Sequence, residues 1–239
     1  MASVPTGPLS GIQVLDRAVL VLDTIARERS CALVDLVRLT DLPRPTAHRI
    51  AVALERHGLL ARDRDGRFVL GGRIAAWGAV AGHGLADAAR PVLARLAAQT
   101  GESAQLYVRE GDRRVCVAVH ERPSGLRDTV PLGAVLPLDR GSGGKVLLAW
   151  ADDVSRFDVD VRELATVRKR GWAESVAERE AGVASVSAPV RAGDGRITGA
   201  ISVSGPIERL GLHPGRRLAG AVADAARTLS GTLSRSLPL

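Results

Sequence analysis

Cysteine is scarce in this sequence. The chain of 239 residues holds only Cys31 and Cys116, and their spacing does not resemble a metal knuckle. Cys116 and His120 are four residues apart and are predicted to share one face of a strand. An isolated pair of this kind is more often core or surface than a metal site. We therefore expect a reducing compartment, no structural disulfide and no metal ligands.

Targeting and membrane segments are also missing. The first residues do not show the charged-then-apolar order of a signal peptide. No uninterrupted apolar run in the sequence approaches the ~20 residues that a membrane helix needs. The sequence therefore predicts a soluble, cytoplasmic protein with no membrane partner.

Catalytic motifs are absent as well. Serines are plentiful, but the Gly-x-Ser-x-Gly nucleophile elbow does not occur. A catalytic nucleophile needs a base beside it. His48 and His57 fall in a basic segment, and the other histidines, at 83, 120 and 213, have no local partner. We expect no enzyme activity.

The glycine-rich run Gly-Ser-Gly-Gly-Lys at 141–145 resembles a phosphate loop only in part. Val146 follows Lys145 where Ser or Thr is required, and Asp139 stands where the first glycine of the pattern should be. A glycine-rich helix start still offers backbone N–H groups to an anion. The run therefore predicts an anion-tolerant helix start and no nucleotide cofactor.

Positive charge is in excess. The formal net charge is +7 and the sequence pI is about 10.7. The only lysines are Lys145 and Lys169, so nearly all of this charge is arginine. The balance favours an anionic partner such as nucleic acid. Arginine richness is also typical of GC-rich genomes, so composition alone does not identify the partner.

One stretch, 42–58, carries basic residues in an ordered pattern. Its apolar residues recur at the spacing of one helix face, namely Ala47, Ile50, Ala51 and Leu54. No carboxylate precedes Glu55 in this stretch. The polar side carries the candidate DNA-contacting residues Arg44, Thr46, His48 and Arg49. An apolar back and a basic front suit the DNA major groove; an ordinary solvated surface helix is the alternative.

The neighbouring segments favour DNA binding. Helical periodicity over 13–29 and 32–40 places two helices before this stretch, which is the helix-turn-helix pattern. Asp65-Gly66 within 59–70 then predicts a β-hairpin. If the loop has two residues, Arg64 lies directly opposite Arg67, and their like charges repel each other. A bound phosphate between them would relieve this repulsion. The alternative is that both side chains extend into water. A hairpin after a basic helix is typical of a wing, whose candidate DNA contacts are Arg62, Arg64 and Arg67.

The remainder mixes helices with antiparallel hairpins and predicts an α+β domain. Two predicted strands, 185–191 and 196–204, each place small hydroxyls on one face and apolar residues on the other. The hydroxyl faces carry Ser185, Ser187, Ser202 and Ser204. Hydroxyls donate and accept, so this face suits a small carboxylate or an amino acid. A solvated outer sheet face is the alternative.

The chain resembles the IclR family of bacterial transcription regulators. The resemblance lies in the order of its helices and in three segments: the Pro-Arg-Pro-Thr-Ala-His-Arg helix, Glu-Arg-His-Gly-Leu-Leu, and the Gly-Arg-Phe-Val-Leu-Gly wing. More narrowly, the chain resembles the actinobacterial NdgR/LtbR-like branch, which is associated with leucine and other amino-acid biosynthesis. The resemblance implies a lead-in over 1–10, a winged helix-turn-helix domain over 11–71, a linker helix over 72–85 with Trp77 at a dimer interface, and a GAF-like effector-binding domain over 86–239.

The resemblance also implies an effector on the serine face. The implied effector residues are Gly141, Ser142, Ser175, Ser185, Ser187, Ser202 and Ser204. Ser175 stands at a position that is often acidic in relatives. The expected partners are double-stranded DNA, a small effector and a second copy of the chain in a homodimer, or further copies in a tetramer. An enzyme with a DNA-binding appendage and a purely structural DNA-bridging protein are the alternatives.

Overall fold

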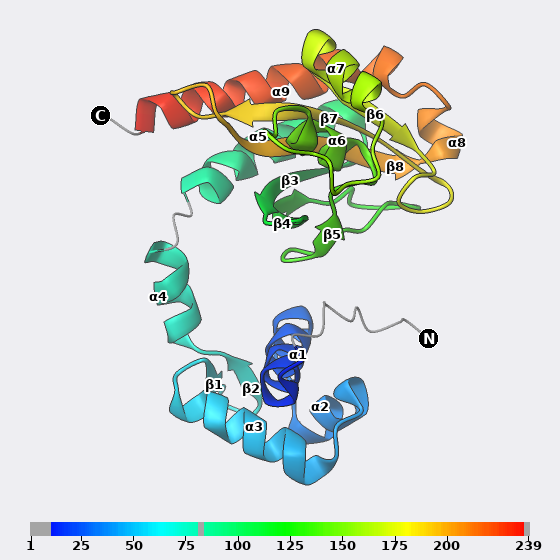
Figure 1. Ribbon diagram of the computed structural model, residues 1–239. Coiled ribbons are helices and arrows are strands. Elements are labelled where there is room, and N and C mark those ends of the chain that lie inside the picture. The colour runs from blue at the N-terminus through cyan, green and yellow to red at the C-terminus, as the bar shows by residue number, and fades with distance from the viewer. Residues whose placement is uncertain (1–10, 81–83, 237–239) are drawn as a thin grey trace. The chain divides into compact units, whose positions relative to one another are not determined.

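The structure is a computed structural model that describes residues 11–80 and 84–236. The chain divides into two compact units, Met1–His83 and Gly84–Leu239, each described here by itself (Figure 1). We call them the N-terminal and C-terminal units. The predicted lead-in over 1–10 lies outside the described residues. The boundary between the units falls inside the predicted linker, whose first part forms helix α4 (Gly72–Val80).

The N-terminal unit is a helix-turn-helix followed by a two-stranded hairpin. Its elements are α1 (Gln13–Glu28), α2 (Leu33–Thr40), α3 (Arg44–Arg56), β1 (Leu60–Arg62) and β2 (Phe68–Leu70). The predicted apolar face of α3 is confirmed, because Ala47, Ala51 and Leu54 are buried. They pack against α1 and α2 in one core that also holds Phe68 of the hairpin. The hairpin is therefore fixed to the helices by burial.

The turn of this hairpin differs from the predicted two-residue loop. The Gly66 N–H donates to the Asp63 carbonyl at 3.1 Å, and the Asp63 N–H donates to the Arg67 carbonyl at 3.0 Å. Gly66 has φ +72°, the left-handed conformation that closes a three-residue loop after a type I turn. Arg64 lies inside this turn and opposes no residue across the hairpin. The predicted repulsion between Arg64 and Arg67 was therefore wrong.

The C-terminal unit is built on one antiparallel sheet of six strands, in the order β5-β4-β3-β8-β7-β6. The strands are β3 (Ser103–Glu110), β4 (Arg113–His120), β5 (Val135–Pro137), β6 (Ala173–Val176), β7 (Val183–Arg191) and β8 (Ile197–Pro206). The extended stretch predicted over 129–138 is a strand only at its end. A turn in which the Ala134 N–H donates to the Pro131 carbonyl interrupts it.

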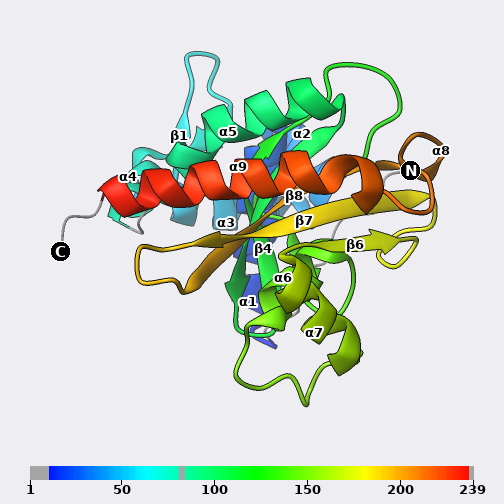
Figure 2. The ribbon, with the colours of Figure 1, turned by 90° about the horizontal axis from the view of Figure 1, so that it is seen from above.

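Helices cover both faces of this sheet. The helices are α5 (Gly84–Thr100), α6 (Ser142–Ala149), α7 (Val161–Arg170), α8 (Ile207–Leu210) and α9 (Gly215–Ser236). Figure 2 shows α5 and α9 side by side on one face, where they bury the larger apolar core. Helices α6 and α7 close the other face over a smaller core. The α+β class is as predicted. Among the described residues, α6 covers the serine face of β7 and β8, so this face is not the solvated outer surface that was the alternative.

A bulge in β4 changes which of its side chains share a face. The register with β3 shifts beside Tyr107, which leaves Val117 as the extra residue. Cys116 packs with Tyr107 under α6, whereas Ala118 packs on the α5 and α9 side. His120 lies two residues after Ala118 and therefore shares its face. The extra residue between Cys116 and Ala118 inverts the alternation, so Cys116 lies on the opposite face. The prediction that Cys116 and His120 share a face was therefore wrong.

Candidate functional site

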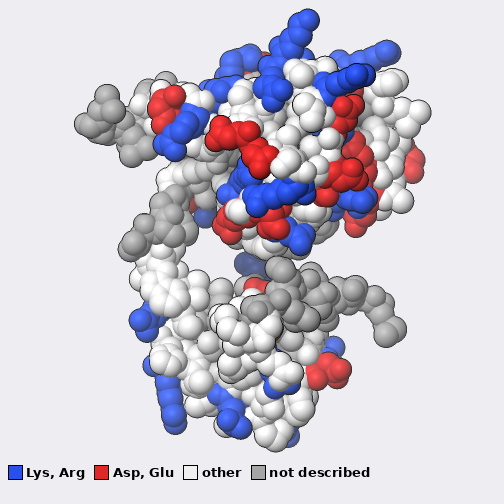
Figure 3. Space-filling model, viewed as in Figure 1, with Lys and Arg blue, Asp and Glu red and all other residues white. Residues whose placement is uncertain are grey.

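Helix α3 presents arginines to solvent with no internal partner. Arg44, His48 and Arg49 are exposed and Thr46 is half-buried. Among the described residues, neither the Arg44 nor the Arg49 side chain has a hydrogen bond or an ion pair. The one carboxylate on the helix, Glu55, is bonded to Arg62 at 3.1 Å. Figure 3 shows basic groups along the edge formed by α3, with few acidic groups among them. The helix therefore offers donors and positive charge to an external anion.

The wing arginines do not all point outward. Arg62 donates to Glu55 at 3.1 Å and to the Gly66 carbonyl at 2.8 Å, and its guanidinium lies 4.1 Å from the ring centroid of Phe68. Arg67 donates to the Ser30 hydroxyl at 3.0 Å. Two of the three predicted DNA contacts in the hairpin thus also hold the hairpin in place. Arg64 is exposed at its tip.

Asp63 shapes the same turn. Its carboxylate accepts from the Arg67 N–H at 2.9 Å and from the Asp65 N–H at 3.0 Å, and the Ser30 hydroxyl donates to it at 2.9 Å. These donors favour the charged form and hold the pKa of Asp63 below its usual range. The turn is therefore an ordered element that positions Arg64.

In the C-terminal unit the predicted serine face exists and is covered by α6. Ser185 opposes Ser204, and Ser187 opposes Ser202, across β7 and β8. The Ser142 hydroxyl lies 2.6 Å from that of Ser185 and 2.7 Å from that of Ser187. Ser187 donates to Ser202 at 2.9 Å. The serines therefore hydrogen-bond to one another and to the start of α6.

Two further side chains complete this cluster. Gln105 of β3 donates to the Ser204 hydroxyl at 3.0 Å. The Ser175 hydroxyl of β6 lies 2.9 Å from that of Ser185 and accepts from the Ser142 N–H at 3.1 Å. Five elements, namely α6 and the strands β3, β6, β7 and β8, thus meet at one polar patch, and the hydroxyls of β7 and β8 have the parity predicted from the sequence.

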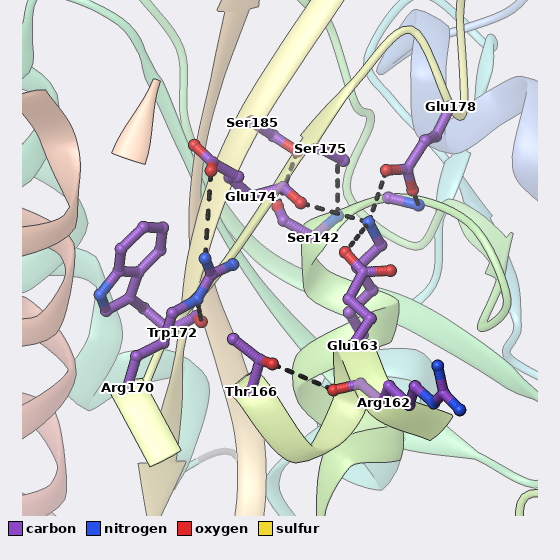
Figure 4. A network of polar contacts seen from close by, with 12 residues as sticks. Ser142, Arg162, Glu163, Thr166, Arg170, Trp172, Glu174, Ser175, Glu178 and Ser185 are labelled. Carbon is purple, nitrogen blue, oxygen red and sulfur yellow. Dashed lines mark hydrogen bonds and ion pairs between the residues drawn. The ribbon is translucent and has the colours of Figure 1, made fainter. Parts of the chain in front are cut away.

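A network of charges fixes the first turn of α6 from outside. The Lys145 ammonium donates to Glu163 at 2.6 Å and to Glu178 at 2.5 Å, and also to the Glu174 carbonyl at 3.3 Å (Figure 4). The second oxygen of Glu178 accepts from the Gly141 N–H at 3.0 Å. The anion expected at this glycine-rich helix start is therefore supplied by the chain itself.

The glycines of the run serve close packing. A Cβ atom at Gly144 would lie 2.0 Å from the Leu138 carbonyl oxygen. One at Gly143 would lie 3.1 Å from the Tyr107 ring and 3.2 Å from the Arg114 guanidinium. The run is glycine-rich because α6 lies directly on a loop and on two large side chains of the sheet.

A small cavity remains between this helix, the sheet and the loop before β5. It encloses about 10 Å³, which is about the space of one water molecule. Five of the seven predicted effector residues line it: Gly141, Ser175, Ser185, Ser202 and Ser204. The other two, Ser142 and Ser187, are fully buried in the hydroxyl cluster.

Four charged or aromatic residues that were not predicted also line the cavity: Tyr107, Arg114, Asp128 and Arg179. One Arg179 nitrogen donates to both Asp128 oxygens at 2.7 Å. Arg114 is 2 % exposed and lies 4.9 Å from the Tyr107 ring centroid. Strand parity could have placed Arg114 inside, because it lies two residues before Cys116 and shares its strand face. Asp128 and Arg179 lie in loops, where no periodic pattern marks them.

Burial shifts the pKa of Tyr107 in the cavity wall and of Cys116, which packs with it. Loss of solvent raises the pKa of Tyr107 and raises the pKa of Cys116 to about 12. Cys116 is therefore a neutral thiol, which is a poor nucleophile and metal ligand. Over the described ranges, no three His, Cys, Asp or Glu side chains gather as a metal site would require. No described helix is both long and apolar enough to cross a membrane.

Comparisons with known proteins match both units. A family model described as the IclR helix-turn-helix domain matches residues 14–64, and one described as Bacterial transcriptional regulator IclR C-terminal matches residues 77–157 and 161–231. The HTH-type transcriptional regulator BhcR of Paracoccus denitrificans is 31% identical over 92% of this chain and 87% of its own length. The glycerol operon regulatory protein of Streptomyces griseus is 32% identical over 92% of this chain and 95% of its own.

A solved structure shares the fold. The crystal structure of an IclR homolog from Microbacterium hydrocarbonoxydans, complexed with 4-hydroxybenzoate, aligns with a TM-score of 0.69 and 23% identity. The alignment covers 94% of this chain and 100% of that one. A helix-turn-helix domain and an α+β domain therefore also occur together in one chain of that solved structure.

Proposed function

The chain belongs to the IclR family of bacterial transcriptional regulators, and from this premise we propose that α3 and the β1–β2 wing contact the operator while the serine-lined cavity senses a small molecule. The protein is thus a DNA-binding transcriptional regulator. Its family and relatives are regulators and not enzymes, which removes the main support for the enzyme alternative.

The observation that carries the DNA contact is the exposed polar side of α3. The Arg44 and Arg49 side chains form no ion pair among the described residues, and the apolar face of α3 is buried. The exposed face can therefore enter a groove while the helix stays packed. In this proposal Arg44, Thr46, His48 and Arg49 contact base edges or the adjacent phosphates. Arg64 contacts the backbone at the wing tip, and the bonded Arg62 and Arg67 add charge beside it.

Effector sensing is supported by the cavity and by one relative. The IclR homolog described above was crystallised with 4-hydroxybenzoate. In this chain, serines from three strands and the glycines Gly141 and Gly143 at the start of α6 line an enclosed polar space. A bound ligand would shift the population toward one arrangement of subunits and so change the spacing of the DNA-contacting helices.

Assembly as a homodimer is part of the same proposal. Helix α1 and the residue before it expose large apolar side chains, among them Val14 at 67%, Ile12 at 58% and Leu15 at 50%. Trp77 of α4 is 52% exposed. Apolar groups gathered in this way on a surface favour association with a partner. A second copy of the chain is the partner that a two-half-site operator requires.

Amino-acid biosynthesis, as in the NdgR/LtbR-like branch, stays a prediction from the resemblance. One relative is a glycerol operon regulatory protein, so family membership does not fix the pathway. Mapping the chromosomal sites that the full-length protein occupies tests it. Sites beside leucine-type biosynthesis genes would support the branch, and sites confined to unrelated operons would contradict it.

The DNA proposal is tested with a duplex that the full-length protein selects from a random pool. Arg49→Ala should weaken binding by ~1–3 kcal/mol at fixed salt if the side chain makes a bidentate base contact. Arg64→Ala should instead make the slope of log affinity against log salt shallower by about one unit. Arg90→Ala, which removes an exposed arginine of α5 that is 72% exposed, is the matched control. Equal affinity of Arg49→Ala and wild type for that duplex would refute the assignment of α3.

A further inference from the structure

A groove runs between α1 and α3 of the N-terminal unit, and we call it the α1–α3 groove. It holds about 680 Å³, and the two helices that form it pack against each other in one core. Three arginines line it, namely Arg17 of α1 and Arg49 and Arg56 of α3. None of the described residues that line the groove is acidic. Of these three arginines, only Arg49 has a role in the DNA contact proposed above.

These arginines have no counter-charge within the part of the chain that the structure describes. The side chains of Arg17, Arg49 and Arg56 form no hydrogen bond or ion pair with any described residue. Glu55, the neighbour of Arg56 in sequence, does not line the groove and is bonded to Arg62 at 3.1 Å. The α1–α3 groove is therefore a surface of unbalanced positive charge, which attracts an anionic partner.

A second groove between two helices shows that this imbalance is not a general property of an arginine-rich surface. It lies between α5 and α9 of the C-terminal unit and holds about 430 Å³. Its charged lining residues are one cation, Arg95, and one anion, Asp224. The excess of positive charge is therefore specific to the α1–α3 groove.

The spacing of the arginines favours an extended anion. Arg49 and Arg56 are seven residues apart, which separates them by about 10 Å along α3. One small anion cannot reach both, whereas a DNA strand carries a phosphate about every 3.4 Å along the helix axis. Apolar side chains lie among the arginines, including Ile50 and Ala53. A polymer of alternating phosphates and sugars matches this mixed lining.

The α1–α3 groove and the wing lie on opposite flanks of α3. The wing is held at Glu55 through Arg62. Ala53, which lines the α1–α3 groove, is two residues from Glu55 and therefore points about 200° away around the helix. A helix about 10–12 Å across nearly fills a major groove about 12 Å wide. When α3 lies in the major groove, its two flanks therefore face the two sugar-phosphate backbones.

We propose that the α1–α3 groove binds the sugar-phosphate backbone of one DNA strand through Arg17 and Arg56, while the wing binds the other strand. This inference rests on the proposed DNA contact of α3, because the groove reaches DNA only when α3 lies in the major groove. It makes α1 a DNA-contacting helix. Leu15 is two residues before Arg17 and points to the other side of α1, where it stays accessible to a second copy of the chain.

Salt dependence tests this on the full-length protein with the duplex that it selects from a random pool. Arg17→Ala and Arg56→Ala should each make the slope of log affinity against log salt shallower by about one unit. At 0.1 M salt each should weaken binding about five- to tenfold, equally for the selected duplex and a scrambled one. Arg17→Lys keeps the charge and should retain most of the slope. Arg27→Ala, which removes an arginine of α1 outside the groove, should bind as wild type does.

Duplexes with one phosphate replaced by an uncharged methylphosphonate locate the contact. A replacement that weakens binding of wild type but not of Arg17→Ala marks the phosphate that Arg17 contacts, because a double-mutant cycle isolates the coupled pair. We expect the phosphates assigned to Arg17 and Arg56 to lie on one strand. Those assigned to Arg64 of the wing should lie on the other strand of the same half-site.

Unchanged salt slopes in both Arg17→Ala and Arg56→Ala would overturn the proposal, as would a loss of affinity confined to the selected duplex. If these variants instead lower the mass of the DNA-free protein in sedimentation, a second copy of the chain occupies the groove and the proposal also fails. Arg49→Ala separates this failure from that of the proposed function. If only Arg49→Ala weakens binding, α3 contacts DNA without the groove. If all three variants bind as wild type does, the DNA contact of α3 itself fails.

Discussion

The two units of this chain use arginine in opposite ways. On α3 of the N-terminal unit, Arg44 and Arg49 are exposed to water, where a charge costs little and can attract an external anion. In the C-terminal unit, Arg114 lies beneath α6 and is 2 % exposed, and its Nε and Nη1 have no acceptor among the described residues. The first arrangement depends on one helix face, and the second depends on a helix, two loops and a sheet packed to within van der Waals contact. We therefore expect substitutions at the buried site to cost much more stability than similar substitutions at exposed positions.

Two glycine positions of the C-terminal unit, one tightly packed and one open, test whether a substitution at the buried site costs more stability. Gly144→Ala places a Cβ atom 2.0 Å from the Leu138 carbonyl oxygen, so α6 must move off the loop. We expect a loss of about 3 kcal/mol or more in the free energy of unfolding of the C-terminal unit. Denaturant unfolding followed by circular dichroism measures it.

Gly220→Ala on α9 is the control for this substitution, because a Cβ there meets nothing within 4 Å. It should stabilise the protein by about 0.5–1 kcal/mol, since alanine favours a helix interior. Losses of equal size at the two positions would mean that α6 is not tightly packed.

The two lysines of the chain form a second matched pair. Lys145 bonds to Glu163 and Glu178 with its side chain 10% exposed, whereas Lys169 is exposed on α7. Lys145→Met removes the ammonium group that pairs with both carboxylates and leaves Glu178 only its bond from the Gly141 N–H. The two carboxylates are 40% and 32% exposed, so water screens part of the penalty, and we expect a loss of about 2 kcal/mol.

Lys169→Met removes the same charge from the surface and should change stability by no more than about 0.5 kcal/mol. The difference between the two variants is read from their midpoints of denaturant unfolding. Similar midpoints for both variants would show that the network around Lys145 does not hold α6.

The stability of the C-terminal unit should depend on alkaline pH because a thiol is buried there. The folded-state pKa of Cys116 is about 12, against an ordinary value of 9.0. Its contribution to stability is complete below pH 9 and is lost as pH rises from 9 toward 12, because the unfolded thiol ionises first. The loss should approach about 1.4 kcal/mol per pH unit inside this window.

Cys116→Ala should flatten the fall in stability between pH 9 and 10, where the buried Tyr107 still contributes little. Native Cys116 should also resist thiol reagents until the protein unfolds. Rapid labelling of Cys116 in the native protein, or a pH profile that Cys116→Ala leaves unchanged, would contradict its burial as a neutral thiol.

The periodic spacing of residues within single elements was enough to predict helix α3 and the hydroxyl face of the sheet. The apolar spacing of Ala47, Ala51 and Leu54 identified α3, because burial on one side of a helix follows its own repeat. The serine parity of β7 and β8 likewise placed four hydroxyls on one face, as the register confirms. Both patterns lie within single elements, so the sequence alone reveals them.

Predictions failed where one residue changed the register. The extra residue at Val117 moved Cys116 and His120 to opposite faces, and the longer turn at Asp63–Arg67 separated Arg64 from Arg67. A bulge and a three-residue loop are set by the hydrogen bonds of the partner strand. Side-chain alternation along one strand contains no record of them.

The sequence by itself therefore determined the basic face of α3, the order of the elements, the α+β class and the hydroxyl face of the sheet. Only the tertiary structure decided which charged side chains are paired within the chain. It bound Arg62 and Arg67 into the wing, placed Glu178 at the start of α6, and joined Asp128 to Arg179. It also buried Arg114 with no acceptor for its Nε or Nη1 in the part of the chain that the structure describes. The physical reason is that a partner comes from whichever distant segment folds within about 3 Å, a distance that no local repeat encodes.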